Sequence, residues 1–343
     1  MDTKVLRQKV LDLAIRGKLV PQDPNDEPAS VLLERIRQQK QQMVKDGKLK
    51  AKDIKNDTII FVSEDNLHYE KFADGSVKCI EDEIPFELPD GWAWSRLGAV
   101  AEAIGDGDHQ PPPQTSFGVP FLVISNVSGG RLSFENTRFV SKEYFSQLPE
   151  TRKPRNGDLL FTVTGSYGIP VLIDSDDKFC FQRHIAIVRP CTISNRYLYV
   201  ILGSSYVKSI CDAKATGTAQ KTVGLATLRE LLIPVAPYKE QMQIYAQTQD
   251  ALSIVDSVSS DKEDLLNIIE SAKAKILDLA IRGQLVPQDP TDEPASVLLE
   301  RIRAEKEELI KQGKIKRDKK ESVIFRGEDN SYYLKTGELV ESL

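Results

Sequence analysis

The sequence has no apolar run near the roughly 18 residues that a membrane-spanning helix needs, and no basic-then-apolar leader. It has only three histidines and four cysteines, and the cysteines show no CxxC spacing. Such a composition supports neither a zinc site nor a disulfide framework. We therefore expect a cytoplasmic protein with no membrane partner, no bound metal and four reduced thiols, at Cys79, Cys180, Cys191 and Cys211.

Sequence patterns typical of catalysis are also missing. There is no Walker loop, and neither the glycine-rich cofactor loop nor the NPPY-like tetrapeptide of a methyltransferase is present. His109 and His184 have no nucleophile paired with them in the sequence, so no triad can be argued. The spacing of Asp106 and Asp108 leaves a metal-dependent nuclease as an alternative, which would cleave DNA as the isolated chain. We expect no catalytic residue and no cofactor in this chain.

Residues 239–282 contain neither proline nor glycine, and their apolar residues recur at alternating steps of four and three. This heptad spacing is typical of a helix that packs along another helix. A helix of this length would extend roughly 65 Å, more than a small domain needs. We predict a spacer and dimerisation helix; an ordinary amphipathic helix with a kink near residues 257–261 is the alternative. Thr248 and Lys262 interrupt the pattern, and the predicted contact residues are Ile244, Ala251, Val255, Leu265, Ile269, Ile276 and Leu279.

The end of this predicted helix begins a sequence that occurs twice. Residues 11–37, LDLAIRGKLVPQDPNDEPASVLLERIR, and residues 277–303 differ only at Lys18/Gln284 and Asn25/Thr291. Two copies are too few for a solenoid, so they flank one unrepeated region. Because surface residues are also unchanged, we expect the copies to dock two molecules of one partner; recent duplication alone would give the same pattern.

The overall pattern predicts an α+β protein with one mixed α/β domain and long helical regions. We expect four parts: a helical module with a β-hairpin at 1–84, the mixed domain at 85–237, the long helix at 238–283 and a second copy of the module at 284–343. The predicted helices are 2–16, 28–47, 141–148, 195–212 and 225–232. The predicted strands are 58–62, 68–72, 121–124, 159–164, 171–173 and 185–188, with a charged linker at 45–55.

The net charge of −5 argues against nucleic acid, but the charge is unevenly distributed. Residues 91–240 carry 16 Lys and Arg against 13 Asp and Glu, whereas the remainder has a net charge of −8. Five polar clusters in this region place amide, hydroxyl or cationic groups beside turns, and such groups can contact base edges and phosphates. For each cluster, an ordinary turn is the alternative. The predicted DNA contacts are Asp108, His109, Gln110, Asn126, Thr164, Ser166, Tyr167, Gln182, Arg183, His184, Thr218, Gln220 and Lys221.

Several motifs together resemble the specificity subunit of type I restriction-modification systems. They are LDLAIRGKLVPQDPNDEPAS, nearly identical in both repeats, IPFELPDGWAWSRLG, GDGDHQPP, GDLLFTVTGSYG, QRHIAIVRP and GTAQKTVGLATLRELLIPVAPYKEQ. The resemblance covers nearly the whole chain and implies a non-catalytic subunit that reads a bipartite DNA site. It also implies that methylation, with S-adenosylmethionine, belongs to modification (methyltransferase) subunits bound by the repeated modules. Restriction would belong to a translocating motor subunit.

Members of this family usually carry two recognition domains, whereas this sequence has one. Its second repeat stops where another PFELPDGWAW entry would follow, so we expect a half-length subunit, natural or truncated. Two copies would pair their long helices antiparallel and present two recognition domains to double-stranded DNA at a palindromic, interrupted site. The alternative function is a protein-binding remnant that occupies modification subunits without specific DNA recognition.

Overall fold

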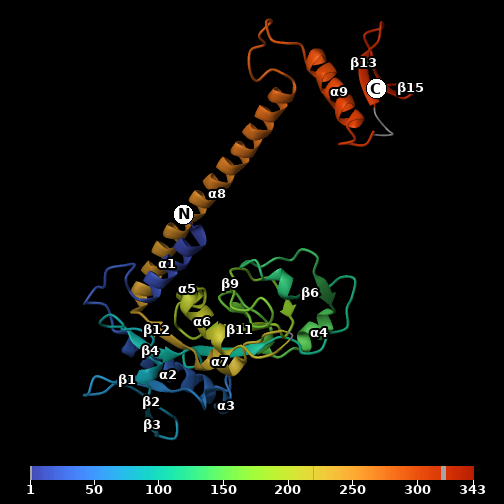
Figure 1. Cartoon of the computed structure of the whole chain (residues 1–343). Coiled ribbons are helices and arrows are strands. Elements are labelled where there is room, and N and C mark those ends of the chain that lie inside the picture. The colour runs from blue at the N-terminus through green and yellow to red at the C-terminus, as the bar shows by residue number, and fades with distance from the viewer. Residues whose placement is uncertain (1, 219, 318–321) are drawn as a thin grey trace. The chain divides into compact units, whose positions relative to one another are not determined.

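The computed structural model describes residues 2–218, 220–317 and 322–343, and its fold is α+β, as predicted (Figure 1). The chain divides into two compact units, Met1–Leu265 and Leu266–Leu343. Among the helices of the described residues, none is long and apolar enough to cross a membrane. The first unit holds the N-terminal module, the unrepeated region and the first half of the long helix.

A four-stranded antiparallel sheet forms the centre of the first unit. Its order is β5 (Ala101–Asp106), β11 (Ile185–Pro190), β8 (Leu159–Thr162) and β9 (Pro170–Leu172). The side chains of a strand alternate between the two faces of its sheet. Thus Ala186 and Val188 pack in one apolar core, while Ile185 and Ile187 pack in another. Burial on both faces explains why the sequence shows short apolar runs here without polar alternation.

A three-stranded sheet contains β10 (Cys180–Phe181), β6 (Val119–Leu122) and β7 (Arg138–Val140), with β10 parallel and β7 antiparallel to β6. Side chains of helix α4 (Lys142–Gln147) pack on it. Strand β6 ends two residues earlier than predicted. The reason is the short 3₁₀ turn η2 (Ile124–Asn126), which Asn126 stabilises by accepting a hydrogen bond from the backbone N–H of Val123 (2.9 Å). A further 3₁₀ turn, η3 (Glu150–Arg152), follows α4.

The helix predicted at residues 195–212 is wrong in one respect, because the chain forms two helices there. They are α5 (Asn195–Leu202) and α6 (Ser205–Lys214). Ser204 has an extended backbone, and its hydroxyl oxygen accepts a hydrogen bond from the backbone N–H of Val207 (3.3 Å). It is therefore the N-cap that starts the second helix.

The two ends of the unrepeated region are held together by a strand pair that the sequence did not predict. Strand β4 (Ala93–Arg96) pairs antiparallel with β12 (Leu232–Val235). Helix α7 (Leu225–Glu230) consequently ends two residues before the predicted boundary, because the next residues enter the strand.

The N-terminal module contains three helices and a three-stranded antiparallel sheet, completed by the 3₁₀ turn η1 (Glu81–Glu83). These elements are α1 (Thr3–Ile15), α2 (Ala29–Lys45), α3 (Ala51–Ile54), β1 (Ile59–Val62), β2 (His68–Lys71) and β3 (Val77–Cys79). Strands β1 and β2 are the predicted hairpin, and β3 was not predicted. The charged run at 45–55 is more than a linker, because it includes the whole of α3.

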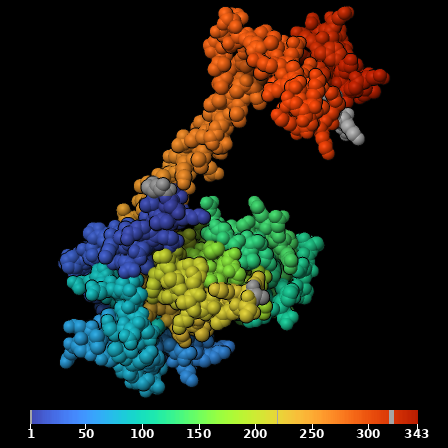
Figure 2. Space-filling view, viewed as in Figure 1, coloured from blue at the N-terminus to red at the C-terminus, as the bar shows by residue number. Residues whose placement is uncertain are grey.

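This module shares one hydrophobic core with the unrepeated region. Ile15, Leu32 and Ile36 pack in the same buried cluster as Leu97 and Tyr197. Figure 2 shows the blue and cyan surface of the module continuous with the yellow and green surface of the unrepeated region. The N-terminal module is therefore part of one folded body with the unrepeated region, residues 85–237.

Helix α8 (Tyr238–Ile281) is continuous over 44 residues and passes through residues 257–261 without a break. Its first half is not a free spacer, since Ile244, Leu252 and Val255 are buried in the first unit. Part of the predicted dimer seam is therefore covered by the chain itself. Leu265, Ile269 and Ile276 are exposed, whereas Ala251 and Leu279 are partly buried.

Helix α1 lies beside the first half of α8 and runs in the opposite direction (Figure 1). The Thr3 hydroxyl donates to the Ser259 hydroxyl (3.4 Å), and further along α1 Arg7 pairs with Asp256. After α1, Asp26 reaches Lys239 at the start of α8 (3.3 Å). Residue numbers thus increase along one segment while they decrease along the other, as in antiparallel packing.

Glu240 connects the start of α8 to both other parts of the first unit. Its carboxylate, only 2% exposed, accepts hydrogen bonds from the Trp92 indole N–H (2.9 Å) and the Gln22 amide (3.2 Å). Burial raises the pKa of this carboxyl above its ordinary value of 4.5, although the two hydrogen bonds oppose the shift. A raised pKa means that the protonated carboxyl stabilises the fold below pH 4.5, and that this stabilisation is lost as the pH rises through the raised value.

We expect Glu240→Gln to be more stable than the parent chain at neutral pH, on the order of 1 kcal/mol, because the buried charge is removed while one oxygen remains to accept from Trp92. The Gln22 amide loses this acceptor but still donates to two backbone carbonyls (2.7 and 3.2 Å). The decline in stability above pH 4.5 should become shallower. Denaturant unfolding followed by tryptophan fluorescence at several pH values measures both effects. Glu230→Gln, at an exposed carboxylate, is the matched control, and an equal pH response in both variants would contradict the prediction.

The second unit reproduces the local structure of the N-terminal module. Helix α9 (Ala295–Lys311) has 17 residues, as α2 has, and the strands β13 (Ser322–Arg326), β14 (Tyr332–Thr336) and β15 (Leu339–Ser342) form a three-stranded antiparallel sheet. Gly17 and Gly283 both adopt a left-handed backbone, with φ of 65° and 66°. Nearly identical sequences therefore take the same local conformation in both places.

Candidate nucleic-acid interface

Four of the predicted polar loops are joined by backbone hydrogen bonds. The predicted clusters are residues 108–110, 164–167, 182–184 and 216–221, and in the structure the first two belong to loops at 106–110 and 163–168. All four lie at the ends of strands of the central sheet or adjoin it. The backbone N–H of Asp108 donates to the Phe181 carbonyl (2.9 Å), and that of Arg183 donates to the Asp108 carbonyl (3.0 Å). These bonds hold the first loop against the third.

The remaining two loops are attached in the same way. The backbone N–H of Val163 donates to the His184 carbonyl (2.9 Å), and that of Gly165 donates to the Lys221 carbonyl (3.1 Å). Segments far apart in the sequence thus form one continuous surface. The arrangement follows from the antiparallel sheet, because the end of β5 and the start of β11 are neighbours in register.

Gly107 makes the closest of these approaches. A Cβ atom at this position would lie 1.9 Å from the Phe181 carbonyl oxygen, so the two backbones can approach this closely only at a residue without a side chain. Close packing at Gly107 sets the distance between the first and third loops.

Ten of the predicted DNA contacts keep solvent-accessible side chains. Their functional groups are a mixture of amide, hydroxyl, imidazole, phenol and cationic groups. They are His109, Gln110, Ser166, Tyr167, Gln182, Arg183, His184, Thr218, Gln220 and Lys221. Arg183 and Lys221 have no ion-pair partner among the residues the structure describes, so both charges are free to meet an anion.

Three predicted contacts are buried and used within the protein. Asp108 pairs with Arg152 (3.2 Å), and the Thr164 hydroxyl bonds to that of Thr222 (3.1 Å). The Asn126 amide accepts from Val123 and donates to the Glu135 carbonyl (3.1 Å). In this conformation all three side chains are buried and shape loops, so their contact with DNA stays a prediction.

The two histidines of the surface differ in their environments. His109 is exposed and bonded to Asp106 (2.8 Å). Burial, assisted by the neighbouring Arg183, lowers the pKa of His184, so its imidazole is neutral near pH 7. The carboxylates of Asp106 and Asp108 are thus engaged by different partners, His109 and Arg152.

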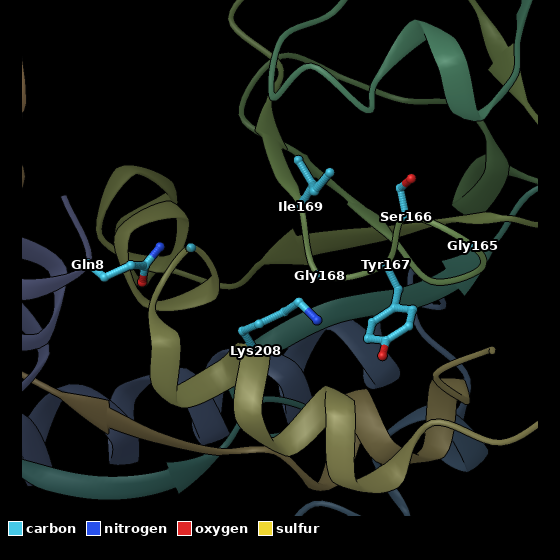
Figure 3. Close-up of a pocket in the computed structure, with 8 residues that line it drawn as sticks. Gln8, Gly165, Ser166, Tyr167, Gly168, Ile169 and Lys208 are labelled. Carbon is cyan, nitrogen blue, oxygen red and sulfur yellow. The ribbon is translucent and has the colours of Figure 1, made fainter. Parts of the chain in front are cut away.

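A shallow hollow of about 500 Å³ lies beside the second loop, lined by Gly165, Ser166, Tyr167 and Lys208 among others (Figure 3). The Lys208 ammonium lies 4.3 Å from the centre of the Tyr167 ring, and the Tyr167 hydroxyl donates to Asp212 (2.8 Å), which raises the pKa of the tyrosine. Lys208, Asp212 and Arg152 were not predicted from the sequence as site residues. The one available signal was the spacing of four between Lys208 and Asp212, which places them on one side of a helix.

Residues 89–267 match the family described as "Type I restriction modification DNA specificity domain". The chain belongs to this family. The matched range contains every loop of the surface and the first half of α8, so the polar surface described above is a feature of the specificity domain itself.

Specificity subunits from Escherichia coli are similar to this chain over most of its length. The EcoAI specificity subunit is 32% identical over 92% of this chain and 58% of its own length, and the EcoEI specificity subunit is 30% identical over 92% and 57%. The chain thus spans less than two thirds of either relative. A crystal structure of the HsdS subunit from Thermoanaerobacter tengcongensis is 26% identical, covers 59% of this chain and 47% of its own, and has a TM-score of 0.41.

Proposed function

We propose that this chain is a non-catalytic DNA sequence-recognition subunit of a type I restriction-modification complex. The observation that carries the proposal is the convergence of four polar loops into one exposed surface inside the residues that match the DNA specificity family. Exposed Arg183, Gln220 and Lys221, with the half-buried Gln182, supply the amide and cationic groups that contact base edges and phosphates.

The proposed partners are double-stranded DNA and modification subunits, with a restriction or translocase subunit as a further component. S-adenosylmethionine belongs to the modification subunits in this proposal. The repeated modules, α2 and α9 with their flanking segments, are the proposed docking elements, because they keep the same exposed residues, such as Arg35 and Arg301 or Arg37 and Arg303.

A homodimer is the proposed state that presents two recognition domains to one site. Its support is the exposed apolar stripe in the second half of α8, which includes Leu265, Ile269 and Ile276. Apolar stripes of this kind on a long helix are covered by another helix. Two identical recognition domains related by a two-fold axis would read a palindromic, interrupted sequence.

Reconstitution with modification subunits, followed by mapping of methylated positions in DNA, tests this function. We expect methylation at a symmetric, gapped motif, and mass measurement should show two copies of this chain. An asymmetric motif would contradict the homodimer. Methylation without sequence preference, or a complex that does not bind DNA, would favour the alternative in which the chain only occupies modification subunits.

A further inference from the structure

The two repeats have nearly the same residues, but one set of their apolar side chains differs in burial. In the first repeat a set of apolar residues, which we call the repeat face, is buried: Leu11, Ala14, Ile15, Val20, Ala29, Leu32 and Ile36. The counterparts in the second repeat are identical in type and all exposed: Leu277, Ala280, Ile281, Val286, Ala295, Leu298 and Ile302. Exposure rises from 1% at Leu32 to 48% at Leu298, and from 0% at Ile15 to 87% at Ile281.

The two positions at which the repeats differ lie outside this face. Lys18 and Asn25 are both exposed in the first repeat, where Gln284 and Thr291 stand in the second. The exposed copy also has the conformation of the buried one. Arg282 bonds to Asp278 at 2.8 Å, as Arg16 bonds to Asp12, and the residue before each second helix, Pro28 or Pro294, has nearly the same backbone angles. The second repeat face is therefore preformed and unoccupied within the described residues of its unit.

The first repeat shows what surface fits this face. Helix α1 packs on α5 and α6, the backbone N–H of Ala29 donates to the Gly91 carbonyl (2.8 Å), and Gly17 lies against Pro89 and Trp92. The first half of α8 completes the contact through Glu240, Asp256 and Ser259. We call these elements, α5, α6, residues 89–92 and the first half of α8, the receiving surface.

We propose that the second repeat face docks on the receiving surface of a second copy of this chain and displaces that copy's own first repeat. The proposal rests on the homodimer of the proposed function and fixes its geometry. Large exposed apolar faces mark interaction sites, and here the matching surface is already present in the same molecule. The exchange is reciprocal, so both copies make the same contact around a two-fold axis.

The contacts of the first repeat determine the register of the two long helices. Thr3 and Arg7 correspond to Ile269 and Lys273, because the copies are offset by 266 residues. Ile269 of one copy then meets Ser259 of the other, and Lys273 meets Asp256 with the charge pairing of Arg7 retained. Asp292 likewise takes the place of Asp26 against Lys239. This register is antiparallel and places the two-fold axis near residues 264–265 of α8.

The free energy of the exchange has one dominant source. The contacts of the first repeat face are replaced by the same contacts of the second, so they contribute little to the net free energy of the exchange. The part of α8 around Leu265, which is 57% exposed, has no counterpart in α1. Ile269, 40% exposed, stands where α1 has the polar Thr3. In the exchanged dimer these residues lie near the axis, where the two helices cover each other. Because the gain comes only from association, the exchanged form should increase with protein concentration.

A cysteine pair on one helix tests the register. Ser259→Cys and Ile269→Cys lie ten residues apart on α8, roughly 15 Å along the helix axis. A disulfide requires Cα atoms within roughly 7 Å, so this pair can close only between two chains. In a Cys79→Ser background, which removes the exposed thiol, we expect a covalent dimer on mild oxidation. Ser259→Cys with Ile268→Cys, one position out of register, should give at least tenfold less.

A second cysteine pair tests the arrangement in which each chain keeps its own first repeat in place. Thr3→Cys with Ser259→Cys places two thiols where the hydroxyl groups are 3.4 Å apart, and we expect a disulfide within one chain. Once formed, this bond should hold the first repeat in place and reduce dimer formation. If the locked chain dimerises as well as the reduced chain, displacement of the first repeat is wrong.

Charge substitutions on α9 give an independent measurement on the full chain. Leu298→Asp should abolish the dimer, whereas Val297→Asp should leave it intact, because Val297 and its counterpart Val31 are similarly exposed, 45% and 46%. Both positions are exposed in the isolated chain, so both variants should fold. A stable dimer that fails to cross-link through residues 259 and 269 overturns the exchange but leaves the homodimer standing. A chain that stays monomeric at every concentration would overturn both the exchange and the homodimer. Methylation mapping tests DNA recognition separately.

Discussion

Gly107→Ala is expected to lower the free energy of unfolding by about 3 kcal/mol and to reduce site-specific DNA binding roughly tenfold or more. The added Cβ would lie 1.9 Å from the Phe181 carbonyl oxygen, so the two backbones must separate. Separation breaks the hydrogen bonds that Asp108 and Arg183 make across the junction. It also moves the exposed Arg183 and His109 relative to each other.

Denaturant unfolding of the chain and DNA binding by the reconstituted modification complex measure the two effects. Gly129→Ala is the matched control, because a Cβ there has no neighbour within 4 Å and Gly129 does not have a positive φ. We expect it to change stability by less than about 0.5 kcal/mol and DNA binding not at all. Parent-like stability of Gly107→Ala would show that the loops do not need this close approach.

Arg183→Ala is expected to weaken binding to the recognised sequence by roughly tenfold to a hundredfold, with a smaller effect on unrelated DNA. Arg183 is exposed in the turn just before β11, and its backbone is fixed by Asp108. Its guanidinium has no ion-pair partner among the described residues. A fixed backbone with a free guanidinium suits a bidentate contact to a guanine edge. Equal weakening on specific and unrelated DNA would assign it to the phosphates instead.

Lys221→Ala distinguishes the two kinds of contact within the same surface. A lysine on the phosphate backbone should weaken all DNA alike and lower the salt dependence by about one unit of slope. Arg196→Ala is the charge-matched control, because Arg196 follows the opposite end of β11 and stacks on Tyr245. Titrations at several salt concentrations with specific and scrambled duplexes separate these outcomes.

The elements that the sequence predicted well are those whose signals are local. Strands β8, β9 and β11 were visible as apolar runs, and α8 as a long segment without proline or glycine. The elements it missed depend on distant partners. Strands β4 and β12 are recognisable mainly through their pairing, and the division between α5 and α6 needed the cap at Ser204 to be identified.

In the candidate site, too, local features were predicted and features that depend on distant residues were not. The loops were found because polar residues beside glycines are a local pattern, and their assembly into one surface is a product of the sheet. Burial of Asp108, Asn126 and Thr164 could not be predicted, because it depends on Arg152, Glu135 and Thr222 arriving from other segments.

The α+β class, the long helix, the repeated module and the polar loops follow from local sequence patterns, and the motifs pointed to the family. Which of these surfaces are covered depends on how the chain packs in three dimensions. The repeats give the clearest case, since Leu32 and Leu298 lie in matching helices of almost the same sequence, yet one is buried and the other exposed. The physical reason is that neighbours along the chain set backbone conformation, whereas burial depends on which distant surface packs against a side chain.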